Sequence, residues 1–200
     1  WIERTATDRF FGSILDNLLI GCGQMVSLVR FRQPLNTVRK IVLVVPRNAQ
    51  LETGFNRWIK KVRNLSRQSG ADLIVYCHGD LRHRLREAFV GKKPSVPASF
   101  RELENLQDIL LVSKDLREDD MLVIVCARRS TISYHSDMDM LPAKVNKHFP
   151  DNNVIIIFPE QSISLSHPSF ESEGFEISPI QENIERISKL GRSMRKMFKS

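Results

Sequence analysis

Residues 38–45 read VRKIVLVV, an apolar run rich in β-branched side chains, with Asn36 before it and Pro46-Arg47-Asn48 after it. A run of this kind, without the alternation of a half-exposed strand, is typical of a parallel strand buried on both faces. The stretch therefore predicts a central strand of an α/β sheet. The rest of the chain can be tested against that class of fold.

The segments that follow continue the alternation of strand and helix. Apolar residues at helical spacing predict an amphipathic helix, which Gly70 ends. These residues are Leu51, Phe55, Trp58, Ile59, Val62 and Leu65. Residues 72–77 (DLIVYC) repeat the strand pattern, and Asp80 is suited to cap a helix. That helix carries Leu81, Leu85, Ala88 and Phe89 on one side.

The middle of the chain predicts a loop, a short helix and a third strand. Residues 92–98 contain two prolines and indicate a loop, and Ser99 with Glu102 forms the capping-box pattern of a short helix. Residues 109–112 are expected to form the third strand. Only residues 113–120 then remain before the next apolar run, which allows a crossover of about two helical turns at most.

Two further strands complete the expected sheet. Residues 121–127 (MLVIVCA) predict the fourth strand, and residues 154–158 (VIIIF) predict the fifth. Between them Ser136 is expected to cap a helix, which Pro150 ends. Its inward-facing residues are Leu141, Val145 and Phe149. Five strands alternating with helices imply right-handed crossovers and a doubly wound, mostly parallel sheet.

Two flanking segments lie outside this unit. Residues 7–20 predict a helix and residues 25–31 a strand. Near the other end, Ser178, Pro179 and Gln181 predict the start of an amphipathic helix that is basic, because no acid follows Glu185. The expected division is 1–37 (helix, strand and linker), 38–160 (the α/β domain) and 161–200 (linker and C-terminal helix). Residues 178–199 either meet an acidic partner, such as a lipid surface or nucleic acid, or form a solvated helix face.

Composition narrows the class of protein further. The chain has 200 residues and a net charge of +7, and no stretch approaches the about 18 to 20 apolar residues of a membrane span. The start lacks both an initiator Met and a signal-peptide pattern, so we expect a fragment of a longer protein. Cys22, Cys77 and Cys126 are too widely spaced for a zinc site, and they fit unpaired thiols in a reducing compartment.

Several short stretches of the chain match a known family. They are 34–37 leading into 42–46, 51–55 with Trp58, 158–161, and the helix containing Gly12-Ser13 with the strand after it. These stretches resemble universal stress protein domains. The closer resemblance is to the cytosolic C-terminal region of bacterial sodium/proton antiporters, where such modules follow the membrane transporter. This resemblance implies that residues 1–37 end one module and that 38–160 form a second one.

The same resemblance implies a location and partners. The partner would be the transmembrane antiporter domain of the same polypeptide, at the cytoplasmic face of the inner membrane, while the fragment itself would be soluble. A homodimer is also expected, because exposed elements of residues 1–37 are available for pairing in trans.

Nucleotide-binding members of the stress-protein family carry an Asp after the first strand and a glycine-rich turn, G-x2-G-x9-G-S/T, after the fourth. Glycines there let backbone N–H groups approach phosphate. This chain has Pro46 at the first place and residues 127–131 (ARRST), without glycine, at the second. Gly12-Ser13 matches only the tail of such a motif. The resemblance thus implies that binding of ATP or AMP has been lost, and an adenine-nucleotide-binding stress protein remains the alternative.

Candidate site residues gather where parallel strands end at their carboxyl side, which is where open α/β sheets bind ligands. They are Arg47, Asn48, Arg128, Arg129, Ser130 and Thr131. Three guanidinium groups beside hydroxyls can clamp an anion. Alternatively, the arginines are solvated or cap carbonyl groups, which is the interpretation we favour.

No pattern indicates catalysis or metal binding. His135, Asp137 and Asp139 are better explained by a helix start, and no nucleophile has a histidine fixed beside it. We therefore expect no catalytic residue and no metal ligand. The leading hypothesis is a non-catalytic regulatory or interaction domain of a cation/proton antiporter. A basic module that binds acidic lipid or nucleic acid is the third candidate, and nucleic acid is disfavoured because no aromatic residues interleave the basic clusters.

Overall fold

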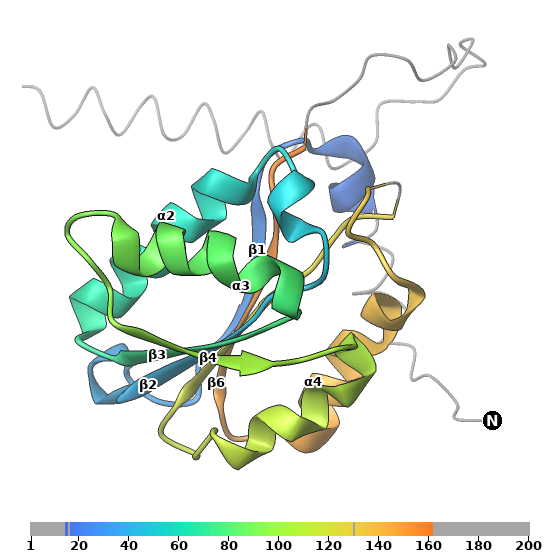
Figure 1. Cartoon of the computed structure of the whole chain (residues 1–200). Helices are drawn as coiled ribbons and strands as arrows, with labels where there is room; N and C mark the ends of the chain where they lie inside the picture. The colour runs from blue at the N-terminus through green and yellow to red at the C-terminus, as the bar shows by residue number, and fades with distance from the viewer. Residues whose placement is uncertain (1–14, 16, 130, 162–200) are drawn as a thin grey trace, which may run out of the picture. The chain divides into compact units, whose positions relative to one another are not determined.

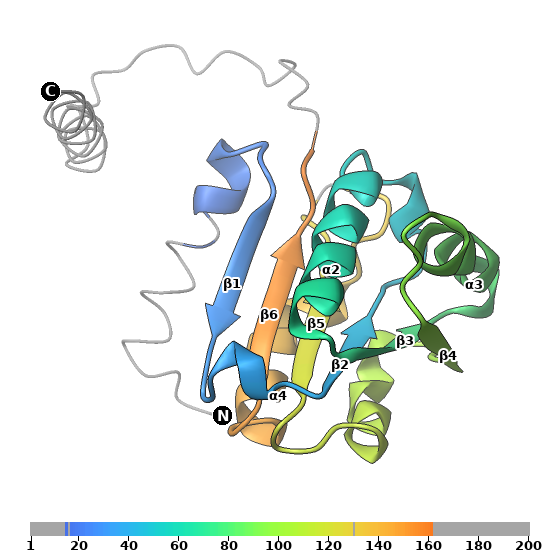
Figure 2. The same ribbon diagram turned by 90° about the vertical axis from the view of Figure 1, so that its left-hand side faces the viewer.

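In the part of the chain that the structure describes, six strands form one sheet in the order β1-β6-β5-β2-β3-β4, and Figure 2 shows β1 at one edge and β4 at the other. The strands are β1 (Val26–Arg30), β2 (Lys40–Val44), β3 (Asp72–Cys77), β4 (Ala98–Glu102), β5 (Met121–Val125) and β6 (Asn153–Phe158). All neighbours are parallel except β1, which runs antiparallel to β6. The computed structural model describes residues 15, 17–129 and 131–161, all of them within the compact unit Trp1–Ile163. A second unit, Ser164–Ser200, lies outside the described residues.

The run at residues 38–45 forms the central strand, as predicted. β2 lies between β5 and β3, and alternate side chains face opposite sides of the sheet. Ile41 and Leu43 pack on one side, and Val42 and Val44 pack on the other. All four side chains are fully buried, which explains why the run is apolar throughout.

Helices cover both faces, so the sheet is doubly wound (Figure 1). On one face lie α2 (Phe55–Ser69) and α3 (Gly79–Arg86), which continues as the π-helical turn η3 (Glu87–Gly91). On the other lie η4 (Leu106–Lys114), η5 (Ser136–Met140) and α4 (Leu141–His148). Two short 3-10 turns, η1 (Leu35–Thr37) and η2 (Ala49–Leu51), flank β2.

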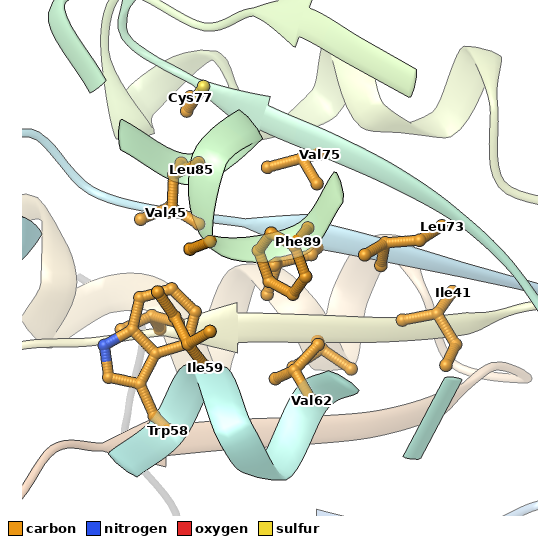
Figure 3. Packing of buried hydrophobic residues seen from close by; sticks show 14 of the residues in the cluster. Ile41, Val45, Trp58, Ile59, Val62, Leu73, Val75, Cys77, Leu85 and Phe89 are labelled. Atoms are coloured by element: carbon orange, nitrogen blue, oxygen red, sulfur yellow. The ribbon is translucent and has the colours of Figure 1, made fainter. Parts of the chain in front are cut away.

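The core on the α2 face contains Trp58 and Phe89 among aliphatic side chains (Figure 3). Trp58 is fully buried, and its ring meets Phe55 edge-on at 5.4 Å between centroids. Phe89 from η3 is also fully buried in this cluster. Burial of such side chains contributes about 2 to 3 kcal/mol each, and it holds α2 against the strands. Gly70 ends α2 with a φ of 67°, as predicted from the sequence.

Two predicted helix caps are wrong by one or two residues. Asp80 lies in the first turn of α3, and the cap is His78, whose Nδ1 accepts from the Asp80 N–H at 3.3 Å. In the same way Ser136 begins η5, and His135 caps it by accepting from the Asp137 N–H at 3.4 Å. The acids remain favourable there because a carboxylate is stabilised at a helix N-terminus.

The middle of the chain departs most from expectation. The predicted helix at Ser99–Glu102 is wrong, because Ala98–Glu102 is β4, parallel to β3. The predicted strand at residues 109–112 is also wrong, since these residues lie in the 3-10 helix η4. Ile109 and Val112 are buried while Leu110 and Leu111 are exposed, which is the three-residue period of that helix. The crossover from β4 to β5 is therefore not the abbreviated one expected.

Residues 25–31 do form a strand, but it joins the main sheet and raises the strand number from the expected five to six. β1 pairs with β6 in a register that places Leu28 opposite Ile156. Residues 15 and 17–21 are helical, and the rest of the helix predicted at 7–20 lies outside the described residues. The helix predicted at 178–199 also lies outside them. No helix in the described part of the chain is long and apolar enough to cross a membrane.

Candidate functional site

The candidate crevice lies at the carboxyl ends of β2 and β5, where the chain order reverses across the sheet. From β2 the chain passes outward to β3 and β4, and it then returns to add β5 and β6 on the other side of β2. This switch point is where open α/β sheets leave a crevice for ligands. The turns after β2 and β5 carry Arg47, Asn48, Arg128, Arg129 and Thr131.

A buried carboxylate takes part in the contacts at this edge. Glu52 follows η2 and is 7% exposed. Its Oε1 accepts a hydrogen bond from the Ser133 N–H at 2.9 Å and another from the Ser133 hydroxyl. Its Oε2 accepts from the Gln161 side-chain amide at 2.8 Å. One side chain therefore joins the turn after β2, the loop after β5 and the end of β6.

These hydrogen bonds set the ionisation of Glu52. Burial raises the pKa of a carboxyl group because it penalises the charged form. Donation from Ser133 and Gln161 outweighs burial, and the pKa of Glu52 lies below its ordinary value. Glu52 is therefore a carboxylate at neutral pH, and it places a negative charge at this edge of the sheet.

Backbone packing closes the same edge next to Glu52. A Cβ atom on Gly54 would lie 2.5 Å from the Glu160 backbone nitrogen and 2.8 Å from its carbonyl oxygen. Only glycine allows this approach. Arg57 of α2 also pairs with the Glu160 carboxylate. The start of α2 is thus packed directly against the chain that leaves β6.

Arg128 makes its hydrogen bonds to backbone carbonyl groups of the same chain. Its side chain comes from the turn after β5, and the residue is 7% exposed. The guanidinium donates to the carbonyl oxygens of Leu19, at 2.7 Å, of Cys22 and of Gln24. These carbonyls belong to the end of the N-terminal helical segment and the turn before β1. Burial lowers the pKa of Arg128, and the contacts are those of a carbonyl cap.

The other candidate residues have separate partners. Arg47 pairs with Asp80 at 3.2 Å, and Arg129 pairs with Asp139 at 3.1 Å. Asn48 has a φ of 64°, which turns the chain after β2. The Thr131 hydroxyl donates to the Arg128 carbonyl at 2.9 Å. Ser130 lies outside the described residues. The arginine side chains therefore have carbonyl or acidic partners of their own, in three different places.

Two hollows found in the described structure lie away from this edge. One, of about 180 Å³, is lined mainly by β1, α4 and β6, including Leu28, Val145 and Ile156. The other lies over α3 and η3 and includes His83, Arg86 and Val90. Among the residues that the structure describes, no group of three or more His, Cys, Asp or Glu side chains is placed to hold a metal ion.

The sequence pattern did not single out Glu52, Ser133 or Gln161 as site residues. Their contacts join turns 81 and 109 residues apart, and no local motif signals such a contact. One signal was available. The stretches 51–55 and 158–161 were two of those that carried the family resemblance, and here they contact one another through Glu52 with Gln161 and Gly54 with Glu160.

Comparison with known proteins does not assign a role to this edge. No protein-family model, no curated protein and no solved structure matches the chain. The contacts around Glu52 and Arg128 are therefore the basis for a functional proposal.

Proposed function

We propose that the chain is a non-catalytic regulatory or interaction domain of a cation/proton antiporter, with the fold of a universal stress protein. It would act at the cytoplasmic face of the membrane, joined to the transporter in one polypeptide. The coarse fold agrees with this proposal, because the sheet is mostly parallel and doubly wound. The contact between residues 51–55 and 158–161 supports it further, since both stretches carry the resemblance.

The observation that carries the proposal is the buried Glu52 carboxylate. In α/β proteins that bind phosphate at this edge, backbone N–H groups and hydroxyls point at the ligand. Here the N–H and hydroxyl of Ser133 both donate to Glu52. A ligand phosphate would have to displace this carboxylate or accept its repulsion. The edge is thereby stabilised without a ligand, which favours a role in protein contact.

The position of β1 supports the proposed tandem arrangement. A helical segment that ends at Gly21 precedes β1, and α4, which ends at His148, precedes β6. Each strand begins five residues after the helix before it, at Val26 and at Asn153. Because β1 and β6 are antiparallel, these two helix–strand units are arranged like the ends of two modules that meet edge to edge. A second copy of the chain is the other partner that we propose.

The gene upstream of the codon for Trp1 provides the first test. We expect an uninterrupted reading frame that encodes a series of membrane-spanning helices. A frame that begins just before Trp1, or that encodes no spans, would overturn the proposal. If spans are present, residues 1–200 can be deleted and ion-driven proton flux measured in membrane vesicles. The shortened transporter should still catalyse exchange, but the regulation of the flux should change.

The rival function is an adenine-nucleotide-binding stress protein. The observation in its favour is that Arg47 and Arg129 remain largely exposed in the turns after β2 and β5. Calorimetry with ATP and with AMP separates the two. We expect no saturable binding in the micromolar range. Micromolar binding that is lost when Arg47 and Arg129 are both changed to alanine, with the fold retained, would favour the rival.

A further inference from the structure

Charge is distributed unequally between the two faces of the sheet. Residues 49–97, which carry α2, α3 and η3, contain ten Lys or Arg and four Asp or Glu. Residues 103–152, which carry η4, η5 and α4, contain six Lys or Arg and nine Asp or Glu. Helices α2 and α3 lie on one face of the sheet and α4 lies on the other (Figure 1). The described domain therefore has a basic side and an acidic side.

The acids of the basic side do not neutralise its outer surface. Glu52 is buried, and Asp80 and Glu87 already pair with Arg47 and Arg84. The fourth acid, Asp72, lies at the start of β3. Helix α2 itself contains no acid.

Six exposed cations on this side have no hydrogen-bond or ion-pair partner among the described residues. They are Lys60, Lys61, Arg67, Arg86, Lys92 and Lys93. Such side chains are solvated in the isolated domain, and their field is available to an external partner. We call the surface formed by these six residues the α2–η3 basic surface.

Hydrogen bonds from the half-buried Arg63 join the two parts of this surface. Arg63 of α2 donates to the carbonyl oxygens of Ala88 and Phe89 in η3, and to those of Lys92 and Pro94 just after it. Residues three and four apart, or seven apart, share one side of a helix. Lys60 and Arg67 therefore lie on the same side of α2 as Arg63, next to the segment that carries Lys92 and Lys93. Lys60, Arg67, Lys92 and Lys93 therefore form one surface, and Lys61 and Arg86 lie on the same two helices, α2 and α3.

We propose that the α2–η3 basic surface binds the headgroups of an anionic lipid bilayer. Its charges lie on α2, at the end of α3 and just after η3, and each Lys or Arg near an anionic membrane surface contributes about 1 kcal/mol to binding. Val90, 38% exposed, lies with Arg86 on η3 and the end of α3, so an apolar side chain is also available at the interface.

Nucleic acid fits the surface less well. Single-stranded nucleic acid is bound by aromatic side chains on which bases stack. The aromatic residues of α2 and η3 are Phe55, Trp58 and Phe89, and all of them are buried in the core. This proposal goes beyond the regulatory function above and does not depend on it, because it is tested with the chain alone.

The test uses the full chain in flotation assays with vesicles of phosphatidylcholine, with and without phosphatidylglycerol. The variant is Lys60→Gln/Lys61→Gln/Arg67→Gln. The matched control is Lys114→Gln/Arg117→Gln/Lys147→Gln, which removes the same charges from exposed positions on the acidic side. Any contribution of residues 178–199 is the same in all three proteins. Thermal melting verifies that each variant remains folded.

We expect the chain to bind only the anionic vesicles, and added salt to weaken the binding. The α2 variant should lose about a hundredfold in partition coefficient, whereas the control should lose much less. Equal losses in the two variants would overturn the proposal. Equally strong binding of the chain to uncharged and to anionic vesicles would also overturn it. Binding to single-stranded DNA by fluorescence anisotropy, without binding to anionic vesicles, would overturn it in favour of nucleic acid.

Discussion

Glu52 and Ser133 are joined by two hydrogen bonds across 81 residues of chain. The Glu52 carboxylate accepts from both the backbone N–H and the hydroxyl of Ser133, and Gln161 donates to its other oxygen. The three partners come from three turns at the carboxyl edge of the sheet. A charged group buried in this way is stabilising only while all its donors remain in place.

Glu52→Gln should destabilise the protein. The glutamine amide can present an oxygen to Ser133, but a neutral amide accepts more weakly than a carboxylate, and its NH2 group replaces the oxygen that accepts from Gln161. We expect a loss of about 1 to 3 kcal/mol in the free energy of unfolding, measured with urea. Glu118→Gln, at an exposed position, is the control and should change it by less than about 0.5 kcal/mol. Equal effects would show that the Glu52 contacts contribute little.

The Glu52 carboxylate should make the free energy of unfolding depend on pH. Hydrogen bonds hold the pKa of folded Glu52 below its ordinary value of 4.5, so the folded state favours the charged form. This stabilisation is fully present above pH 4.5 and is lost as the pH falls through the folded pKa. The difference in unfolding free energy between the original protein and Glu52→Gln should therefore shrink as the pH is lowered below 4.5. A constant difference would contradict the assignment.

Gly54→Ala should destabilise the protein through a steric clash alone. Gly54 has a φ of −77°, which alanine adopts readily, so the backbone conformation is not the obstacle. The added Cβ would lie 2.5 Å from the Glu160 backbone nitrogen. Overpacking of this kind costs about 1 to 3 kcal/mol. Gly21→Ala is the matched control, because nothing lies within 4 Å of the Cβ position at residue 21. The melting temperature of this variant should not fall.

The long apolar and periodic segments of the fold could be predicted from the sequence. β2 is an unbroken apolar run, and α2 shows a 3.6-residue period that ends at a glycine, so local patterns suffice for both. The prediction of a helix at residues 99–102 was wrong because the capping-box pattern Ser-x-x-Glu also fits a short exposed strand. The prediction of a strand at residues 109–112 was wrong because a four-residue apolar run does not distinguish a strand from a 3-10 helix.

Only the location of the candidate site could be predicted from the sequence, and not the contacts within it. Strand order puts the turns after β2 and β5 at the switch point, and the alternation of strands and helices in the sequence indicates those turns. The partner of Arg128 was not predictable, because its carbonyl acceptors belong to a segment 104 to 109 residues away. Only the antiparallel addition of β1 to β6 brings that segment to the site.

Arg128→Lys should loosen β1. The guanidinium reaches three carbonyl groups at once, and an ammonium on a lysine side chain does not reproduce that planar arrangement. We expect faster amide hydrogen exchange in residues 22–30 and a loss of about 1 to 2 kcal/mol in local stability. Arg67→Lys, on the exposed side of α2, is the control. Unchanged exchange in β1 would show that Arg128 does not hold this strand.

The three cysteines should differ sharply in reactivity toward a thiol reagent. Burial raises the pKa of Cys77 to about 11 and that of Cys126 to about 12, so almost no thiolate is present at neutral pH and the sulfur atoms are enclosed. Cys22 is partly exposed. The native protein should react rapidly at one thiol and the denatured protein at three, and Cys22→Ser should abolish the rapid reaction. Rapid modification of all three thiols in the native protein would show that the sheet opens at β3 and β5.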